Sequence, residues 1–99
     1  MNPERTRKTL ILSAALQLAE RGGFANMTRE AIAARANVST GLVSQHFGTM
    51  KELRRAVIGE AIRCANLDVV AQALAAGHPR AQSAPEELRR AAALSLVGG

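Results

Sequence analysis

The sequence predicts an all-α fold, and three observations support this. Hydrophobic residues make up 47% of the chain, whereas aromatic residues make up only 2%. Runs in which Val, Ile, Thr or Tyr alternate with polar residues, which would favour strands, are almost absent. Alanine is frequent, and apolar residues recur at spacings of three and four, as they do in amphipathic helices. A chain of 99 residues buries only about 60 to 65% of its unfolded surface, so we expect a partner chain to extend a modest core.

The first helix is predicted over residues 4–21, where the helical spacing of apolar residues is clear. Gly22 and Gly23 end it, because glycine accepts the left-handed backbone that often follows a helix. The residues expected on its buried side are Leu10, Ile11, Ala14, Ala15 and Leu18.

Two short helices are predicted next, over residues 29–36 and from about residue 40 to residue 47. Thr28 is expected to cap the first and Ser39 the second, because their hydroxyls accept hydrogen bonds from free backbone N–H groups. Asn37 tolerates positive φ, so a tight turn is expected between the two helices. This arrangement is a helix-turn-helix. The residues expected to anchor its second helix are Val38, Val43 and Phe47, with Leu42 at the margin.

A long helix is predicted from Thr49 to about residue 76. Thr49 and Glu52 have the spacing of a capping box, and Gly77 to Pro79 would end the helix. At about 1.5 Å per residue it would be roughly 40 Å long. Its second half has few polar residues, which makes it too apolar for a helix with one side in water. This half therefore needs a second burial partner.

A short last helix is predicted over residues 83–97, with Ser83 and Glu86 at capping-box spacing and Pro85 in the first turn. The long helix and this one cannot cover each other fully, so we expect two copies to form a four-helix interface around a twofold axis. The residues expected at this dimer interface are Ile62, Leu67, Val70, Leu74, Leu88 and Leu94. Residues 1–58 then form one domain, and residues 59–99 form a dimerisation region continuous with the long helix.

The positive charge is concentrated in the first domain. The net charge is +5, and residues 1–58 hold nine Lys and Arg against four acids, whereas residues 59–99 hold four of each. This asymmetry indicates a part that binds a polyanion and a part that is electrically balanced. Residues 37–47, "NVSTGLVSQHF", nevertheless contain no Lys, Arg, Asp or Glu.

Other protein classes find little support in the sequence. Cys64 is the single cysteine, so it forms no intramolecular disulfide and is expected to be a small core residue in a reducing compartment. No Cys or His cluster has metal-ligand spacing, so we expect no metal and no cofactor. Neither His46 nor His78 has a recognisable nucleophile or a carboxylate pair nearby, so we expect no enzyme activity. No apolar run approaches the roughly 18 residues of a membrane span. We expect a cytoplasmic protein without membrane contact.

Residues 28–53, "TREAIAARANVSTGLVSQHFGTMKEL", resemble the N-terminal DNA-binding domain of the TetR family of bacterial transcriptional regulators. The run "VSTGLVSQHF" is most similar to the choline-responsive, BetI-like members. The resemblance extends over about residues 5–60 and implies a three-helix helix-turn-helix domain. The family usually has glycine at Asn37, often an aromatic at Ser44, and a lysine at Met50, where this chain has Lys51 one residue later. Members are typically much longer and carry an inducer-binding domain, so we expect a naturally short relative without a small-molecule effector.

The resemblance makes residues 40–47 the recognition helix, which reads base edges in the major groove. Glutamine can pair with adenine, and hydroxyls can serve as donor or acceptor, whereas glycine permits close approach. The residues expected to read bases are Thr40, Gly41, Ser44 and Gln45.

Affinity is then expected from contacts with phosphates on either side of the groove. Helix N-termini attract anions through their free N–H groups and dipole. The residues expected to contact phosphate are Thr28, Arg29, Ser39, His46, Thr49 and Lys51, with Arg5, Arg7 and Lys8 reaching from the N-terminus. For Thr28 and Thr49, capping alone is an equally good interpretation.

The resulting hypothesis is a homodimeric repressor that binds double-stranded DNA at a palindromic operator. The alternative is a protein-interaction module, an adaptor or antitoxin, whose apolar C-terminal helices bind a different protein.

Overall fold

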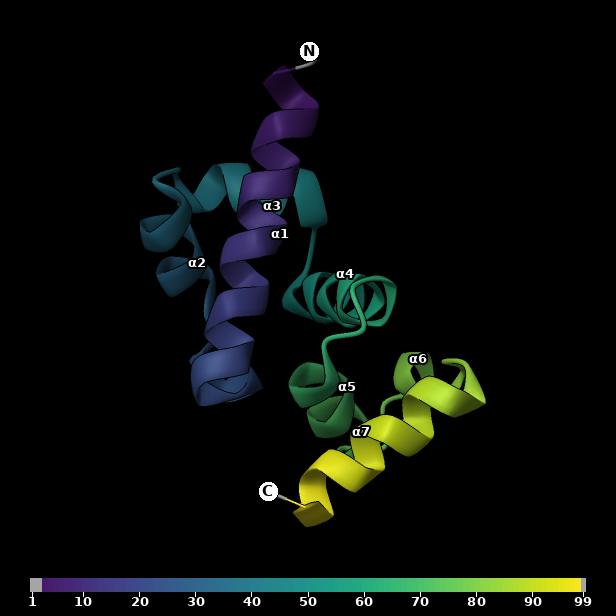
Figure 1. The fold of residues 1–99 in the computed structure, drawn as a ribbon. Helices are drawn as coiled ribbons and strands as arrows, with labels where there is room; N and C mark the ends of the chain where they lie inside the picture. Colours follow the sequence, from purple (N-terminus) through teal and green to yellow (C-terminus); the bar gives the residue numbers. More distant parts are fainter. Residues whose placement is uncertain (1–2, 99) are drawn as a thin grey trace. The chain divides into compact units, whose positions relative to one another are not determined.

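The computed structural model describes the backbone of residues 3–98 and the side chains of residues 6–96. Within this range the chain is all-α, with seven α-helices, one short 3-10 helix and no strand (Figure 1). The predicted fold class is therefore confirmed. None of these helices is long and apolar enough to cross a membrane. The helices are α1 (Pro3–Gly22), η1 (Phe24–Asn26), α2 (Arg29–Ala36), α3 (Thr40–Phe47), α4 (Met50–Arg63), α5 (Leu67–Ala75), α6 (Pro79–Gln82) and α7 (Glu86–Gly98).

The chain divides into two compact units, Met1–Val57 and Ile58–Gly99. In the first unit, α2 packs against both α1 and α3. A hydrogen bond from Arg35 Nε to Gln17 Oε1, at 2.7 Å, also joins α2 to α1. The predicted anchors Val43 and Phe47 are buried and Val38 is half-buried. The largest side chains that are fully buried in this unit are Ile11, Met27, Ile32, Val43, Leu53 and Val57.

In the second unit, α5 and α7 lie side by side (Figure 1). Small side chains fill much of this packing, which allows the two helix backbones to approach closely. The connection between α6 and α7 is held by a hydrogen bond from Arg89 Nε to the Ala84 carbonyl at 3.0 Å. The buried residues of this unit are Ile58 and Ala61 of α4, Val69, Val70, Ala71 and Ala73 of α5, Ala81 of α6, Ala84, and Ala92 of α7.

The prediction of one long helix from Thr49 to residue 76 is wrong. Helix α4 ends at Arg63, and Ala65 has a left-handed backbone with φ of 54°. The Asn66 side chain then accepts a hydrogen bond from the Val69 N–H at 3.2 Å and caps α5. The Asn66 side chain satisfies a free N–H group at the start of a new helix. This cap outweighs the apolar spacing, which continues across the break. Because the break begins at Cys64, that cysteine is exposed and is not the core residue expected.

The region before the last helix also differs from the prediction. A short helix, α6, begins after His78, whose ring accepts a hydrogen bond from the Arg80 N–H at 3.2 Å. Ser83 ends this turn, and its hydroxyl donates to the Arg80 carbonyl at 2.8 Å. Because Ser83 is the C-cap of α6 and α7 begins only at Glu86, the predicted capping box between these two residues does not form.

Candidate nucleic-acid interface

Residues at both ends of helix α3 favour the caps and turns that bound it. Asn37 ends α2 in the left-handed conformation, with φ of 57°, as its sequence position predicts. The Ser39 hydroxyl accepts a hydrogen bond from the Leu42 N–H at 3.1 Å and so caps α3. Gly48 ends α3 with φ of 77°, and its N–H donates to the Ser44 carbonyl at 2.7 Å. These local interactions fix both ends of the helix.

The predicted base-reading residues lie on the side of α3 that does not enter the core. Thr40, Gly41 and Gln45 are exposed and Ser44 is half-buried, whereas Val43 and Phe47 are buried. A Cβ added at Gly41 would meet only the Ser39 hydroxyl, at 3.8 Å, so nothing in the protein crowds this position. The exposed part of α3 is therefore an uncharged surface with hydrogen-bonding groups.

The start of α2 combines a cap with a cation. The Thr28 hydroxyl accepts a hydrogen bond from the Ala31 N–H at 3.1 Å, which confirms its capping role. Arg29 is half-buried, and its Nε is buried without a hydrogen-bond partner. Sequence reasoning predicted Arg29 as a surface cation and missed this unpaired donor, because burial of one atom depends on the packing around it.

The start of α4 carries the predicted capping box. The Thr49 N–H donates to Glu52 Oε2 at 2.9 Å, and the Glu52 N–H donates to Thr49 Oγ1 at 3.2 Å. Lys51, in the first turn of α4, is exposed and takes no part in the two hydrogen bonds of the capping box. The capping interpretation of Thr28 and Thr49 is thus observed, and a second role toward phosphate stays a prediction.

The N-terminal cations include one that contacts helix α3. The Lys8 ammonium lies 5.7 Å from the centre of the Phe47 ring, within the range of a cation–π interaction. The half-buried His46 ring lies 6.5 Å from the same Phe47 ring, centre to centre. Arg7 is exposed, and the Arg5 side chain lies outside the described residues. The contact between Lys8 and Phe47 joins residues far apart in the sequence, so no local pattern predicted it.

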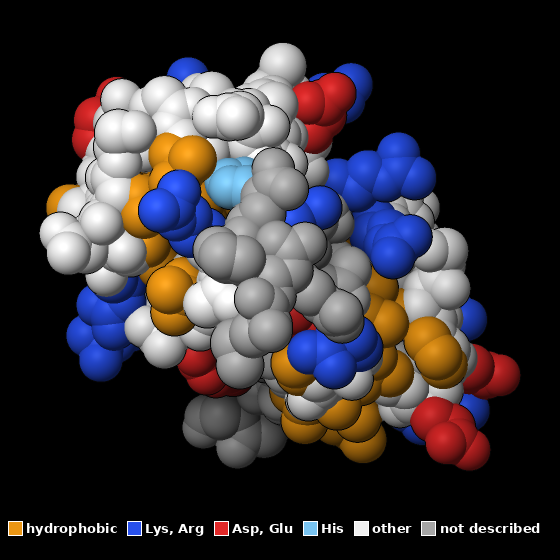
Figure 2. Space-filling view, turned by 90° about the horizontal axis from the view of Figure 1, so that it is seen from above, with side chains coloured by type: hydrophobic (Ala, Val, Ile, Leu, Met, Phe, Trp, Pro, Cys, Tyr) orange, Lys and Arg blue, Asp and Glu red, His pale blue; other side chains and the backbone are white. Residues whose placement is uncertain are grey.

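Figure 2 shows Lys and Arg side chains in blue on the surface of the described residues, together with apolar side chains in orange, acidic side chains in red and a histidine in pale blue. Among the described residues, no cluster of three or more His, Cys, Asp and Glu could hold a metal ion.

The residues predicted at the dimer interface differ widely in exposure. Leu94 is 64% exposed, and Ile62, Leu67, Leu74 and Leu88 are half-buried. Val70 has no exposed surface, so it belongs to the packing within its own chain and cannot contact a second copy in this conformation. Leu96 was not predicted and is 59% exposed. The assignment of Val70 is corrected because the break after α4 turns α5 and changes which side of it is covered.

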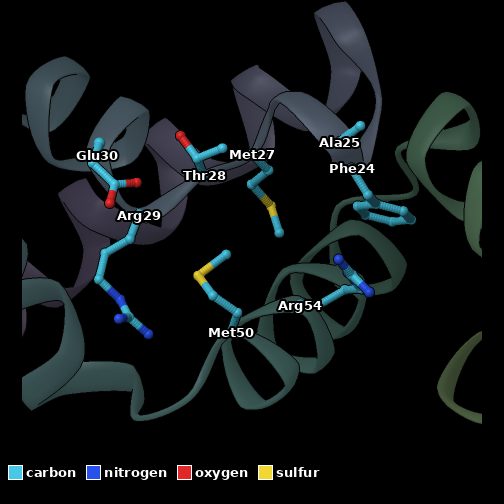
Figure 3. Close-up of a pocket in the computed structure, with 8 residues that line it drawn as sticks. All are labelled: Phe24, Ala25, Met27, Thr28, Arg29, Glu30, Met50 and Arg54. Carbon is cyan, nitrogen blue, oxygen red and sulfur yellow. The ribbon is translucent and has the colours of Figure 1, made fainter.

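A pocket of about 320 Å³ lies in the first unit, between the start of α2 and the start of α4 (Figure 3). Arg54 stands over the Phe24 ring, with its guanidinium carbon 5.6 Å from the ring centre. The residues that line the pocket are Phe24, Ala25, Met27, Thr28, Arg29, Glu30, Met50 and Arg54.

The comparison with known families agrees with this geometry. The model of the tetR family of bacterial regulatory proteins matches residues 11–57, a range that includes α2, α3 and the start of α4. No curated protein and no solved structure matches the chain.

Proposed function

Because residues 11–57 are a helix-turn-helix DNA-binding domain of the tetR family of bacterial regulatory proteins, we propose that this DNA-binding transcriptional regulator is a homodimeric repressor of a palindromic operator. It would occupy the operator and block access by RNA polymerase. Such a protein acts in the cytoplasm, where the bacterial chromosome lies.

One observation carries the proposal. The exposed side of α3 presents Thr40, Gly41 and Gln45, and none of them is needed for the core. A buried apolar side and an uncharged outer side allow the helix to enter a groove without giving up its packing. Glutamine can then pair with adenine through two hydrogen bonds, and hydroxyls can contact either partner of a base pair.

Contacts with phosphate would supply most of the affinity. The capped N-termini of α2, α3 and α4 each offer free N–H groups and a favourable dipole for an anion. Lys51 and Lys8 add exposed cations, the second held over Phe47. The proposed phosphate contacts are Thr28, Arg29, Ser39, His46, Thr49, Lys51, Arg7 and Lys8, with Arg5 at the end of the chain.

Dimerisation would double the number of base contacts. A twofold dimer places its two recognition helices in successive major grooves, about 34 to 36 Å apart or a multiple of this distance. The exposed Leu94 and the half-buried Leu88 provide apolar surface on α7 for such an interface, together with Ile62, Leu67 and Leu74. We assign DNA binding to residues 1–58 and dimerisation to residues 59–99.

The test begins with the selection of bound duplexes from a random DNA pool. Affinities of the wild type, Gln45→Ala and Lys51→Ala are then measured on the selected duplex and on its single-base variants. Gln45→Ala should lose about 1–3 kcal/mol on the selected duplex and relax the preference at one position per half-site. Lys51→Ala should weaken binding to all duplexes alike and reduce the salt dependence by about one phosphate contact per copy.

The matched control is Arg55→Ala, which removes an exposed cation of α4 to which no DNA contact is assigned. It should retain the sequence preference of the wild type. If no duplex is preferred over scrambled DNA, or if the Gln45 and Lys51 variants change binding in the same way, this assignment of roles is wrong.

The second candidate function is a protein-interaction module. It is favoured by Leu94 and Leu96, two leucines of α7 that are 64% and 59% exposed. Sedimentation of the purified protein distinguishes the candidates, because a stable homodimer would cover this surface. A monomer that forms a tight complex with a different protein would instead support an adaptor or antitoxin role.

A further inference from the structure

We propose that the pocket between the start of α2 and the start of α4 binds a small organic anion with an apolar body, such as a medium-chain carboxylate. This pocket lies inside the DNA-binding unit.

The size and walls of the pocket fit a small amphipathic molecule. Its volume of about 320 Å³ is within the range of small-molecule sites, which runs from about 300 to 1,000 Å³. Figure 3 shows the Met27 and Met50 side chains reaching toward each other from the α2 and α4 sides. Met50 is half-buried and offers surface to a ligand, whereas Met27 is buried and forms the floor behind it. Phe24 and Ala25 add further apolar wall. Methionine side chains are flexible and polarisable, so they adapt readily to an alkyl chain.

The charge of the ligand is indicated by Arg29. Its Nε is buried without a hydrogen-bond partner, although a buried donor on a charged group is costly to leave unpaired. Nε has no exposed surface, so a ligand reaches it only after a small shift of the Arg29 side chain, which lines the pocket. A carboxylate could then accept two parallel hydrogen bonds from the guanidinium and satisfy this donor. Thr28 and the first N–H groups of α2 lie beside it, and the dipole of α2 favours an anion at this end.

Two further charged side chains line the pocket. Arg54 is held over the Phe24 ring and provides a second cation. Glu30 is the single acidic residue in the lining, and it is exposed, as is Arg54, so water screens both of these charges. Arg29 is half-buried and is screened less, so it contributes most to the local field. A free phosphate ion would use the cations but leave the methionine and phenylalanine walls unused, which favours a ligand with an apolar body.

Occupancy would affect DNA binding, and this consequence rests on the proposed function. Thr28 and Arg29 are proposed phosphate contacts and also line the pocket. A carboxylate that pairs with Arg29 would compete with a DNA phosphate for the same guanidinium. The bound anion should therefore weaken DNA binding.

The first experiment measures ligand binding without DNA. The full-length protein is labelled with ¹³C at the methionine methyl groups and titrated with sodium octanoate, and separately with inorganic phosphate and octan-1-ol. The Met27 and Met50 methyl resonances should shift and saturate with octanoate, at concentrations where phosphate and octan-1-ol cause little change. Equal shifts with phosphate would contradict the role of the apolar walls in binding. Equal affinity for octan-1-ol would contradict the role of the arginines. The absence of saturation would contradict both roles.

Variants then locate the charge contact. Arg29→Gln should weaken octanoate binding by roughly tenfold or more, as expected for loss of a charge-assisted hydrogen bond. Arg54→Gln provides a second variant should the first fail to fold, and it should also weaken binding. Arg55→Gln changes an exposed neighbour that does not line the pocket and should leave octanoate affinity unchanged. Equal losses in all three variants would point to general charge and overturn the site.

A last measurement separates this proposal from the proposed function. Octanoate is added to the complex with the selected duplex, and release of DNA is followed by fluorescence anisotropy. Octanoate binding with no sequence-selective DNA binding would contradict the proposed function alone. Selective DNA binding without methyl shifts would contradict the ligand site alone.

Discussion

Replacing Gly48 with alanine should destabilise the junction between α3 and α4. Gly48 has φ of 77° and ψ of −129°, a region that is almost restricted to glycine, so alanine costs about 1–3 kcal/mol there. The added Cβ would also lie 1.8 Å from Glu52 Oε2, the atom that accepts the Thr49 N–H. Disruption of that cap costs about 0.5–2 kcal/mol. We expect a total loss of about 2–4 kcal/mol, a large fraction of the 5–15 kcal/mol that stabilises a typical domain.

The assay is urea unfolding followed by circular dichroism, with Gly59→Ala as the matched control. Gly59 lies within α4, and its added Cβ would approach the Arg80 guanidinium, with the nearest atom at 3.1 Å. Because Arg80 is exposed and can move aside, the gain in helix propensity should dominate, and the control should be more stable than the wild type by up to about 1 kcal/mol. If Gly48→Ala loses less than about 0.5 kcal/mol, positive φ and the capping box do not restrain this junction as reasoned.

Three other predictions concern α3, the turn before it and the end of α4. Gly41→Ala should raise the thermal stability slightly, because alanine has a higher helix propensity than glycine. It should weaken binding to the selected duplex, because the new methyl group lies on the exposed side of α3. Unchanged DNA affinity would place that side away from the groove. Asn37→Ala should destabilise the domain by about 1–2 kcal/mol, and Asn37→Gly should not, because φ of 57° is costly for alanine; equal stabilities in urea unfolding would refute this. The Arg63 guanidinium, hydrogen-bonded to Glu60, lowers the pKa of that carboxyl. The stabilisation that this ion pair contributes is present at neutral pH and is lost as the pH falls through the lowered pKa of Glu60. Wild type and Glu60→Gln should therefore differ in urea unfolding at neutral pH and converge in acid. An undiminished difference in acid would contradict the pairing.

Much of the helix-turn-helix was predictable because its signals are local. The hydroxyls of Thr28 and Ser39 each satisfy a backbone donor only three residues away, and Asn37 adopts positive φ through its own conformational preference. Such interactions depend on residue type and spacing alone. The limits of α2 were therefore predicted correctly, as was the end of α3 at Phe47.

The second unit was predicted less well because its apolar spacing was ambiguous. Apolar residues continue on one helical stripe through the region around Asn66, so periodicity alone favoured one long helix. The tertiary structure shows the break, because α5 packs against α7 and both Val69 and Val70 are buried. The same packing removed Val70 from any dimer interface and left Cys64 exposed.

The sequence by itself determined the helical class, the capped turns around α3 and the uncharged character of α3, since these follow from residue types within a few positions of one another. Only the tertiary structure decided that Lys8 lies over Phe47, that Arg29 has a buried unpaired donor, and that Met27 and Met50 share one pocket. These features join residues from different helices, and their burial and distances depend on how the helices pack.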